Sequence, residues 1–260
     1  IDASGVAGIC SKILELNDRP KVIAGMQYEM LDVPTDDYLD FYIWPEYAEK
    51  GYLWMIPKCE GRANVGLVTE VKSGAVKELD RFIADTDEFK NLEVVNPPWR
   101  DDGRKVRGFG GTIPISGPHE TTHSDGILLI GDAAGFTSPL FEGGSHLALK
   151  SAQFAAKTAA DAISKGDFTA TNLKEYTESW KAEFPPYHKI LRGKSALYSL
   201  SDNDMSVMGR CFPDEMSDMG VSGKAMVAIR LLIRRPSLYF RSIIPAMLAF
   251  GYSRAKYYGW

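Results

Sequence analysis

Cysteine is scarce in this chain, and its scarcity excludes several kinds of chemistry. The 260 residues include only Cys10, Cys59 and Cys211, which lie too far apart for a CxxC redox or metal pair. His119 and His123 are four residues apart, but their loop is rich in Pro and Thr and has no helical frame, so we expect no metal site. A low, odd number of cysteines indicates a reducing compartment, and we interpret the chain as cytoplasmic.

Long apolar runs and a strong net charge are also missing. No stretch reaches the ~18 uninterrupted apolar residues of a spanning helix, and we find no signal peptide. The net charge is −4, and 45% hydrophobic with 25% charged residues is typical of a globular chain with its own core. We expect no nucleic-acid partner.

Several catalytic and nucleotide-binding motifs do not occur. We find no Ser-His-Asp set, no HExxH and no pair of carboxylates at catalytic spacing. The GxGxxG fingerprint is missing as well, since Gly108, Gly110 and Gly111 have the wrong spacing. The chain begins with Ile1 rather than Met, and IDASGVAG is typical of a strand end running into a turn. We therefore expect the sequence to start in the middle of a fold.

The most informative stretch is Gly126–Ile163. It opens with Ile127–Ile130, a short apolar run that suits a strand buried on both faces. Gly131 and Asp132 follow at the carboxyl end of that strand, where open α/β sheets bind ligands. The sequence therefore predicts a ligand-facing turn at this point.

A helix amino terminus is predicted to point back toward the same turn. After a loop that contains Pro139, Gly143 and Gly144 open an Ala-rich segment without Gly or Pro until Gly166. A helix start offers unpaired N–H groups and a positive dipole end, and two glycines allow an anionic or carbonyl-bearing ligand to approach closely. Gly-flanked turns of this kind also occur for packing alone, so the pattern by itself leaves both interpretations open.

The order of these residues resembles a known flavin motif. GDAAG, then a Pro and a double Gly before an Ala-rich helix, is similar to the second flavin fingerprint of glutathione-reductase-like FAD enzymes. Within that superfamily the chain most resembles the geranylgeranyl reductase family. The resemblance implies an FAD cofactor whose ribityl hydroxyl binds Asp132 and whose pyrophosphate and pyrimidine edge face the helix start. The cofactor-binding residues that it implies are Gly131, Asp132, Ala133, Pro139, Gly143 and Gly144.

Residues 22–71 have the pattern of an antiparallel meander. Short apolar segments rich in aromatic and β-branched residues are bounded by Pro, Gly or Asp, which predicts strands over Lys21–Leu31, Tyr38–Trp44, Gly51–Ile56 and Asn64–Thr69. Gly61 is placed in the turn of a hairpin between Tyr52–Pro57 and Arg62–Thr69. Apolar residues at helical spacing predict a helix within Ser73–Phe89, and Lys105–Ser116 returns to strand character.

The hairpin carries a second motif, GYLWMIPKCEGRANVGL. Alternation places Tyr52, Trp54 and Ile56 on one face and Leu53 and Met55 on the other. An aromatic face is usually core, but this one resembles the Tyr-x-Trp-x-Phe-Pro-Lys signature of geranylgeranyl reductases, with Ile56 in place of Phe. In that family the signature borders the isoprenoid cavity, which implies substrate contacts from Tyr52, Trp54, Pro57, Lys58, Val65 and Gly66.

The carboxyl-terminal part is predicted to be helical and basic. Leu173–Phe184 and Tyr187–Leu200 are amphipathic, and SDNDMSVMG has a polar start suited to a helix cap. Residues 189–260 contain 11 Lys or Arg against 5 Asp or Glu, whereas residues 1–188 contain 19 against 29. A basic tail with apolar runs and aromatic residues suits an anionic membrane surface, here the inner face, but a solvated basic face explains it equally well.

These observations give an α+β fold class with three parts. Residues 1–20 and 105–165 form part of an FAD-binding domain, 21–104 an antiparallel substrate-binding domain, and 166–260 a helical carboxyl-terminal domain. The resemblance implies a carboxyl-terminal portion of a longer enzyme that lacks the GxGxxG unit.

The resemblance also implies an activity. It is the reduction of isoprenoid double bonds by hydride from flavin N5, in lipid or in pigment or quinone precursors, with ferredoxin or NAD(P)H as electron donor. An electron-transfer flavoprotein dehydrogenase, a monooxygenase and a non-catalytic lipid-binding module are alternatives.

Phe141 and Glu142 depart from the family pattern of small residues. We expect the Glu142 side chain to point to solvent and His146 to be a plain helix-surface residue.

Overall fold

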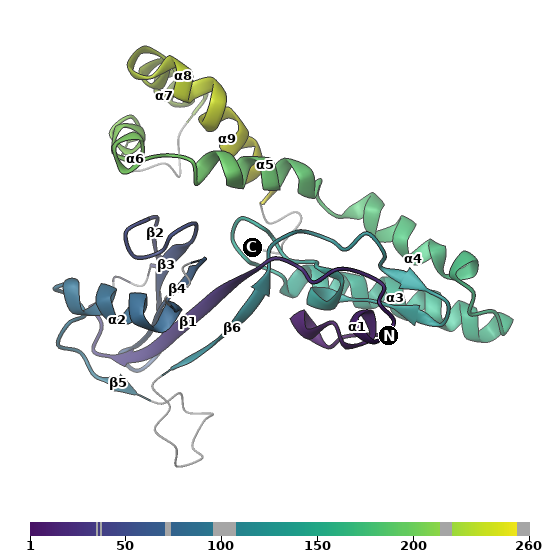
Figure 1. Cartoon of the computed structure of the whole chain (residues 1–260). Helices are drawn as coiled ribbons and strands as arrows, with labels where there is room; N and C mark the ends of the chain where they lie inside the picture. Colours follow the sequence, from purple (N-terminus) through teal and green to yellow (C-terminus); the bar gives the residue numbers. More distant parts are fainter. Residues whose placement is uncertain (35, 37, 71–73, 96–107, 214–219, 254–260) are drawn as a thin grey trace. The chain divides into compact units, whose positions relative to one another are not determined.

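A computed structural model describes residues 1–34, 36, 38–70, 74–95, 108–213 and 220–253 (Figure 1). The chain divides into two compact units: unit 1 contains Ile1–Lys21 and Pro114–Trp260, and unit 2 contains Val22–Ile113. The expected strand residues 105–107 and the aromatic residues at 257–260 lie outside the described residues. The division into three functional domains stays a prediction.

Unit 2 is built on an antiparallel sheet whose order differs from a simple meander. The strands run β2-β3-β4-β1-β5, and β6 also pairs with β1. Their bounds are β1 Val22–Leu31, β2 Asp40–Tyr42, β3 Tyr52–Pro57, β4 Arg62–Thr69, β5 Val94–Val95 and β6 Phe109–Pro114. A meander would place each strand beside the next one in the sequence. This prediction was wrong for β1, which pairs with β4 rather than with β2. Strand β1 lies between β4 and β5 inside the sheet, and Ile23, Tyr28, Glu29 and Met30 are its buried residues.

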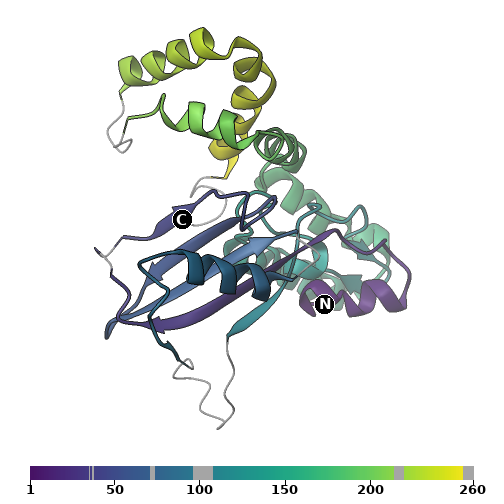
Figure 2. The same cartoon turned by 60° about the vertical axis from the view of Figure 1, so that its left-hand side comes forward.

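The predicted hairpin is confirmed. Strands β3 and β4 pair from Tyr52↔Val68 to Pro57↔Ala63, and Gly61 lies in the turn with a φ of +68° that favours glycine. Helix α2 (Ala75–Asp85) packs on one face of this sheet, as Figure 2 shows. The core on that face includes Tyr28, Leu53, Met55, Val65, Leu67, Leu79 and Phe82.

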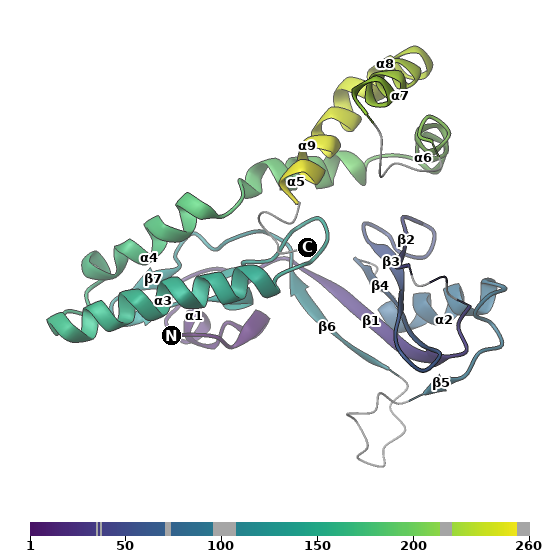
Figure 3. The same ribbon diagram turned by 180° about the vertical axis from the view of Figure 1, so that it is seen from behind.

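Unit 1 contains the predicted turn and helix. After the 3₁₀ turn η1 (Gly5–Ala7) and α1 (Ile9–Ile13), the later part brings β7 (His123–Ser124), β8 (Ile127–Leu128) and the 3₁₀ turn η3 (Gly131–Ala134). Helix α3 (Ser145–Lys165) starts after Gly144, ends before Gly166 and runs beside α4 (Ala170–Glu183) (Figure 3), so the helix prediction is confirmed. The predicted strand is shorter than expected, because the described residues pair it only with β7 and with one parallel bridge between Asp2 and Leu129.

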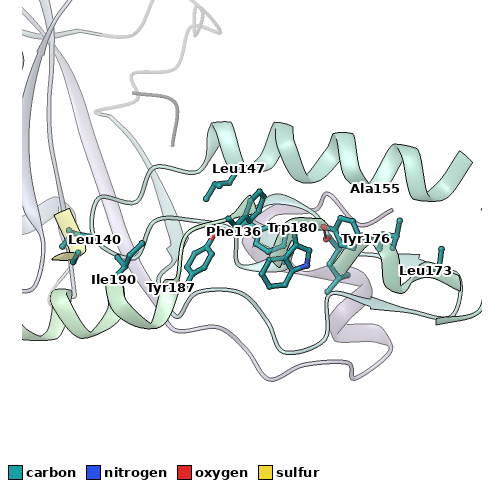
Figure 4. Close-up of a cluster of buried hydrophobic side chains, with 14 of the residues drawn as sticks. Phe136, Leu140, Leu147, Ala155, Leu173, Tyr176, Trp180, Tyr187 and Ile190 are labelled. Atoms are coloured by element: carbon teal, nitrogen blue, oxygen red, sulfur yellow. Dashed lines mark hydrogen bonds between the residues drawn. The ribbon is translucent and has the colours of Figure 1, made fainter. Parts of the chain in front are cut away.

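The core of unit 1 gathers around Phe136, directly after the turn. Its ring centre lies 5.0 Å from that of Trp180 and 4.9 Å from that of Phe184, both from the end of α4. The hydroxyl of Tyr176 donates to the carbonyl oxygen of Leu129 (Figure 4). These contacts fix the strand end and the turn against α4.

The rest of unit 1 is helical, as predicted. The helices are α5 (Tyr187–Leu197), α6 (Asp202–Gly209), α7 (Val221–Arg234), α8 (Pro236–Leu238), the π-helix η4 (Tyr239–Ile243) and α9 (Ile244–Tyr252). Ser201 caps α6 in a capping box with Asp204, which confirms the expected polar cap. None of the helices in the described ranges is sufficiently long and apolar to cross a bilayer.

Helices α5 and α9 cross closely at Gly193. A Cβ atom built there would lie 2.2 Å from the Cβ of Ala249 and 2.5 Å from the carbonyl oxygen of Pro245. We expect Gly193→Ala to separate the helices and lower the free energy of unfolding by about 1–3 kcal/mol in urea denaturation. Gly209→Ala is the matched control, because no atom lies within 4 Å of its built Cβ, and it should be neutral or stabilising. Equal losses in both variants would contradict the close crossing.

Candidate flavin-binding and substrate-binding surfaces

In unit 1 the turn at Gly131 is held directly by α3. Gly131 has a φ of +54°, in the left-handed region, and its N–H donates to the hydroxyl of Ser151 at 3.1 Å. The Ser151 hydroxyl in turn donates to the carbonyl of Ala148 at 2.9 Å. A Cβ atom at Gly131 would lie 3.2 Å from that of Ala148, so a larger residue would press on the helix.

Asp132 lies beside the start of α3. A Cβ atom built on Gly144 would lie 3.4 Å from Oδ1 of Asp132 and 3.2 Å from the Thr137 side chain. Burial raises the pKa of the Asp132 carboxyl, and the Thr137 hydroxyl opposes that rise. The carboxyl group of Asp132 therefore lies close to the helix start. This close approach is possible because Gly144 has no side chain between them.

Helix α3 begins without a side-chain cap in the described structure. Its N-cap residue is Gly144, which has no side chain to accept a hydrogen bond, and the first turn contains no acidic residue. The backbone N–H groups of a first helical turn have no partner within the helix, so they are available to a carbonyl or an anion. Ala133 and Pro139 are buried, and they support this turn from inside.

The loop before α3 is closed by its own backbone. The N–H of Ser138 donates to the carbonyl of Gly143 at 2.8 Å, and the N–H of Glu142 donates to the carbonyl of Ser138 at 2.9 Å. The expectation that the Glu142 side chain points to solvent was wrong. That side chain is only 3% exposed and lies 3.2 Å from Nζ of Lys194 on α5, which is itself buried. Burial of both charges is tolerated because each neutralises the other.

Phe141, the other residue that departs from the family pattern, contacts the last helix. Its ring centre lies 5.2 Å from that of Phe250 on α9. The two departures are thus the points at which this loop packs against α5 and α9.

In unit 2 the predicted alternation along β3 is confirmed. Leu53 and Met55 lie in the core under α2, whereas Trp54 and Ile56 are half-buried on the opposite face. Tyr52 shares that opposite face, which we call the open face of the sheet. The ring of Tyr52 stacks on Phe41 of β2 with ring centres 4.3 Å apart.

Trp54 lies across the open face over two neighbouring strands. Its Nε1–H donates to Oε1 of Gln27 at 3.1 Å, and β4 separates the two strands that carry them. A Cβ atom at Gly66 of β4 would lie 2.5 Å from the indole and 2.5 Å from the Cβ of Gln27. A side chain at position 66 would therefore collide with the indole as it reaches Gln27, which gives a physical reason for the glycine of the signature.

The remaining signature residues are placed differently. The ammonium of Lys58 lies 3.0 Å from the carboxylate of Glu29, which also binds Arg62 at 3.2 Å and whose side chain is fully buried. Val65 is fully buried in the core under α2, on the face opposite to Trp54. Pro57 ends β3 and is half-buried. The structure thus brings Tyr52, Trp54, Lys58 and Gly66 to the open face and Val65 to the core.

Sequence reasoning missed four residues at these surfaces. Gln27 and Glu29 interrupt an apolar strand at every second position, a signal that the sequence does contain. Phe41 and Lys194 carried no comparable signal, because only strand order and helix packing bring them near Tyr52 and Glu142. In the described parts of the chain, no three His, Cys, Asp or Glu residues are grouped so that they could hold a metal ion.

Comparison with known sequences identifies relatives along most of the chain. Residues 21–97 match the family described as the geranylgeranyl reductase catalytic domain. A digeranylgeranylglycerophospholipid reductase 2 of Methanopyrus kandleri is 34% identical over 82% of this chain and 54% of its own length. A digeranylgeranylglycerophospholipid reductase of Methanocaldococcus jannaschii is 32% identical over 94% of this chain and 62% of its own length. The chain thus spans little more than half the length of these curated relatives.

Solved structures share the fold. A geranylgeranyl bacteriochlorophyll reductase-like protein of Thermoplasma acidophilum superposes with a TM-score of 0.73 at 24% identity, over 91% of this chain and 59% of that one. A flavin-dependent halogenase superposes with a TM-score of 0.54 at 22% identity, over 96% of this chain and 48% of that one. The fold is therefore the α+β fold of flavin-dependent enzymes, which confirms the predicted fold class. Together with the sequence matches, it shows that the chain belongs to the geranylgeranyl reductase family, a membership that implies a flavin cofactor of the FAD type.

The close approach at Gly66 can be tested by substitution. We expect Gly66→Ala to displace the Trp54 indole, break its hydrogen bond to Gln27 and red-shift the tryptophan emission of the folded protein. Gly111→Ala on β6 is the control, because its built Cβ has no atom within 4 Å. An unchanged emission spectrum in Gly66→Ala would mean that the indole does not depend on this space.

The raised pKa of the Asp132 carboxyl predicts that this group lowers the stability of the folded protein at neutral pH but not in acid. Because burial raises the pKa of the folded carboxyl above its unfolded value, its contribution to stability is present at low pH and is lost as pH rises through the folded pKa. Asp132→Asn should therefore raise the melting temperature of flavin-free protein at pH 7, and this gain should vanish in acid.

Asp167→Asn is the control of opposite sign. Hydrogen bonds from Thr169 lower the pKa of the Asp167 carboxyl, so this substitution should lower the melting temperature at pH 7 and have no effect in acid. A loss at pH 7 in Asp132→Asn would contradict the assigned burial cost.

Proposed function

We propose that the whole protein is an FAD-dependent reductase of isoprenoid double bonds, acting on geranylgeranyl chains of lipids or of pigment or quinone precursors. The observation that carries this proposal is the open face of unit 2. Trp54 lies over Gly66 there, beside Tyr52, within the segment that matches the geranylgeranyl reductase catalytic domain. The names of the sequence relatives support a lipid with geranylgeranyl chains as substrate.

The residues around the turn of unit 1 fit a flavin. The uncapped start of α3 offers backbone N–H groups, and Asp132 offers a carboxylate for a ribityl hydroxyl. We assign cofactor contacts to Gly131, Asp132, Ala133, Pro139, Gly143 and Gly144, the last because a side chain there would lie against Asp132 at the helix start. When bound, FAD supplies the hydride that reduces the alkene, and ferredoxin or NAD(P)H replenishes it.

The substrate assignment follows from chemistry. A polyprenyl chain has no polar group, so only apolar and aromatic area can hold it, at ~25 cal/mol per Å² buried. Tyr52 and Trp54, whose indole lies over Gly66, provide such area, while Pro57 and Val65 support it from within the sheet. Lys58, ion-paired with Glu29, lies at the polar end of the same strand. We propose a cytoplasmic enzyme that works at the inner face of the membrane.

Trp54→Ala in the protein expressed from its complete gene tests the substrate surface. The purified protein should be yellow, and after chemical reduction its flavin should be reoxidised by a geranylgeranyl lipid. Loss of about 60 Å² of apolar contact, at ~25 cal/mol per Å², corresponds to about a tenfold loss of kcat/KM. We expect that loss for geranylgeranyl chains and a smaller one for geranyl chains, which reach less of the surface.

Trp44→Ala is the matched control, because Trp44 packs edge-on against Tyr47 and Phe82 on the α2 side. It should affect both chain lengths equally. A colourless protein from a flavin-rich host would refute the cofactor, and equal losses for both chain lengths in Trp54→Ala would remove Trp54 from the chain-binding surface.

A further inference from the structure

The last helical stretch of unit 1, residues 220–253, has an unusual charge composition. It contains five basic residues and no Asp or Glu; the basic residues are Lys224, Arg230, Arg234, Arg235 and Arg241. Arg230, Arg234, Arg235 and Arg241 are exposed. Basic residues without acidic neighbours on their own helices create a positive surface that attracts anions.

Helix α7 carries apolar residues on two faces. Val227 and Leu231 are buried in a small core with Cys211 and Ile243. Met226, Ile229 and Ile233 lie at i, i+3 and i+7 and are 52%, 52% and 76% exposed. A helix that packs on its own domain has a single apolar stripe, so this second stripe is not explained by the fold of unit 1.

Helix α9 and the π-helix before it repeat this arrangement. Ile243, Ala246 and Ala249 are buried, and Ala249 lies against α5. Large apolar side chains at helical spacing are exposed on the other side, namely Phe240, Ile244, Met247 and Leu248. We call the two exposed stripes, Met226/Ile229/Ile233 and Phe240/Ile244/Met247/Leu248, the carboxyl-terminal apolar stripes.

Arginines accompany both stripes in sequence. Arg230 follows Ile229, Arg234 follows Ile233 and Arg241 follows Phe240. Large apolar side chains beside cations suit the boundary between lipid headgroups and acyl chains, where the apolar groups are buried and the cations meet phosphates. Helix α7 has 14 residues and α9 has 9, fewer than the ~20 needed to span a bilayer, so they would lie in the plane of the surface.

We propose that the carboxyl-terminal apolar stripes and their arginines dock this protein onto an anionic lipid bilayer. The choice of a bilayer rather than a protein partner rests on the lack of acidic residues in this stretch and, through the proposed function, on a substrate that resides in lipid. Docking places the enzyme where its substrate is dissolved.

Co-sedimentation with vesicles tests this docking. The protein from the complete gene should bind vesicles that contain phosphatidylglycerol more tightly than vesicles of phosphatidylcholine alone, and high salt should release it. Ile229→Ser/Ile233→Ser and Met247→Ser/Leu248→Ser should each weaken binding to anionic vesicles by about tenfold or more. Arg230→Gln/Arg241→Gln should weaken binding to anionic vesicles and reduce its salt dependence, because two of the five cations are removed.

Ile13→Ser/Ile163→Ser is the matched control, since both side chains are as exposed but belong to α1 and α3, and it should bind as the wild type does. Wild-type protein that stays in solution, or serine variants that bind equally well, would overturn the proposal. So would a wild-type dimer that Ile229→Ser/Ile233→Ser converts to a monomer without any vesicle binding. The serine variants should still turn over lipid that is dispersed in detergent. If wild-type protein binds vesicles but does not turn over this lipid, the proposed function is refuted and the docking proposal is not.

Discussion

The left-handed backbone at Gly131 is the constraint on which unit 1 depends. It lets the strand end turn so that one N–H reaches Ser151 of α3, while the carbonyl of Leu129 receives the Tyr176 hydroxyl from α4. With Phe136 packed against the end of α4, the turn is fixed from two helices. Asp132 therefore occupies a defined position beside the start of α3, and its buried carboxyl costs stability that a bound ligand could return.

Unit 2 depends on a different constraint: helix α2 covers one face of its sheet. Helix α2 occupies the face that carries Leu53 and Met55, so every second residue of β3 is left on the other face. Aromatic residues dominate this face, and Trp54 is held in place there by its hydrogen bond to Gln27 and by the space at Gly66. A rigid aromatic surface loses little entropy when an apolar chain covers it, which suits a flexible isoprenoid.

The sequence predicts the turns and the helix ends of this protein, but it does not predict which distant segments lie side by side. The hairpin with Gly61 and the boundaries of α3 follow from turn residues and from glycines that end a periodic run, so they were predictable. The position of β1 beside β4 was missed, because period-two alternation fixes which face a residue takes but not which strand lies next to it. Phe41 was missed for the same reason.

Glu142 is buried against α5 although it lies in a loop. A charged loop residue is usually solvated, but Lys194 on α5 provides a buried counter-charge that no local pattern announces. The adjacent Gly193 is where α9 crosses α5, and Phe250 of α9 reaches back to Phe141 in the same loop. The loop before α3 is thus packed against α5 and against α9, and α9 also carries the exposed Met247 and Leu248. Two residues that look like departures from a flavin motif are therefore the contacts that join this motif to the carboxyl-terminal helices.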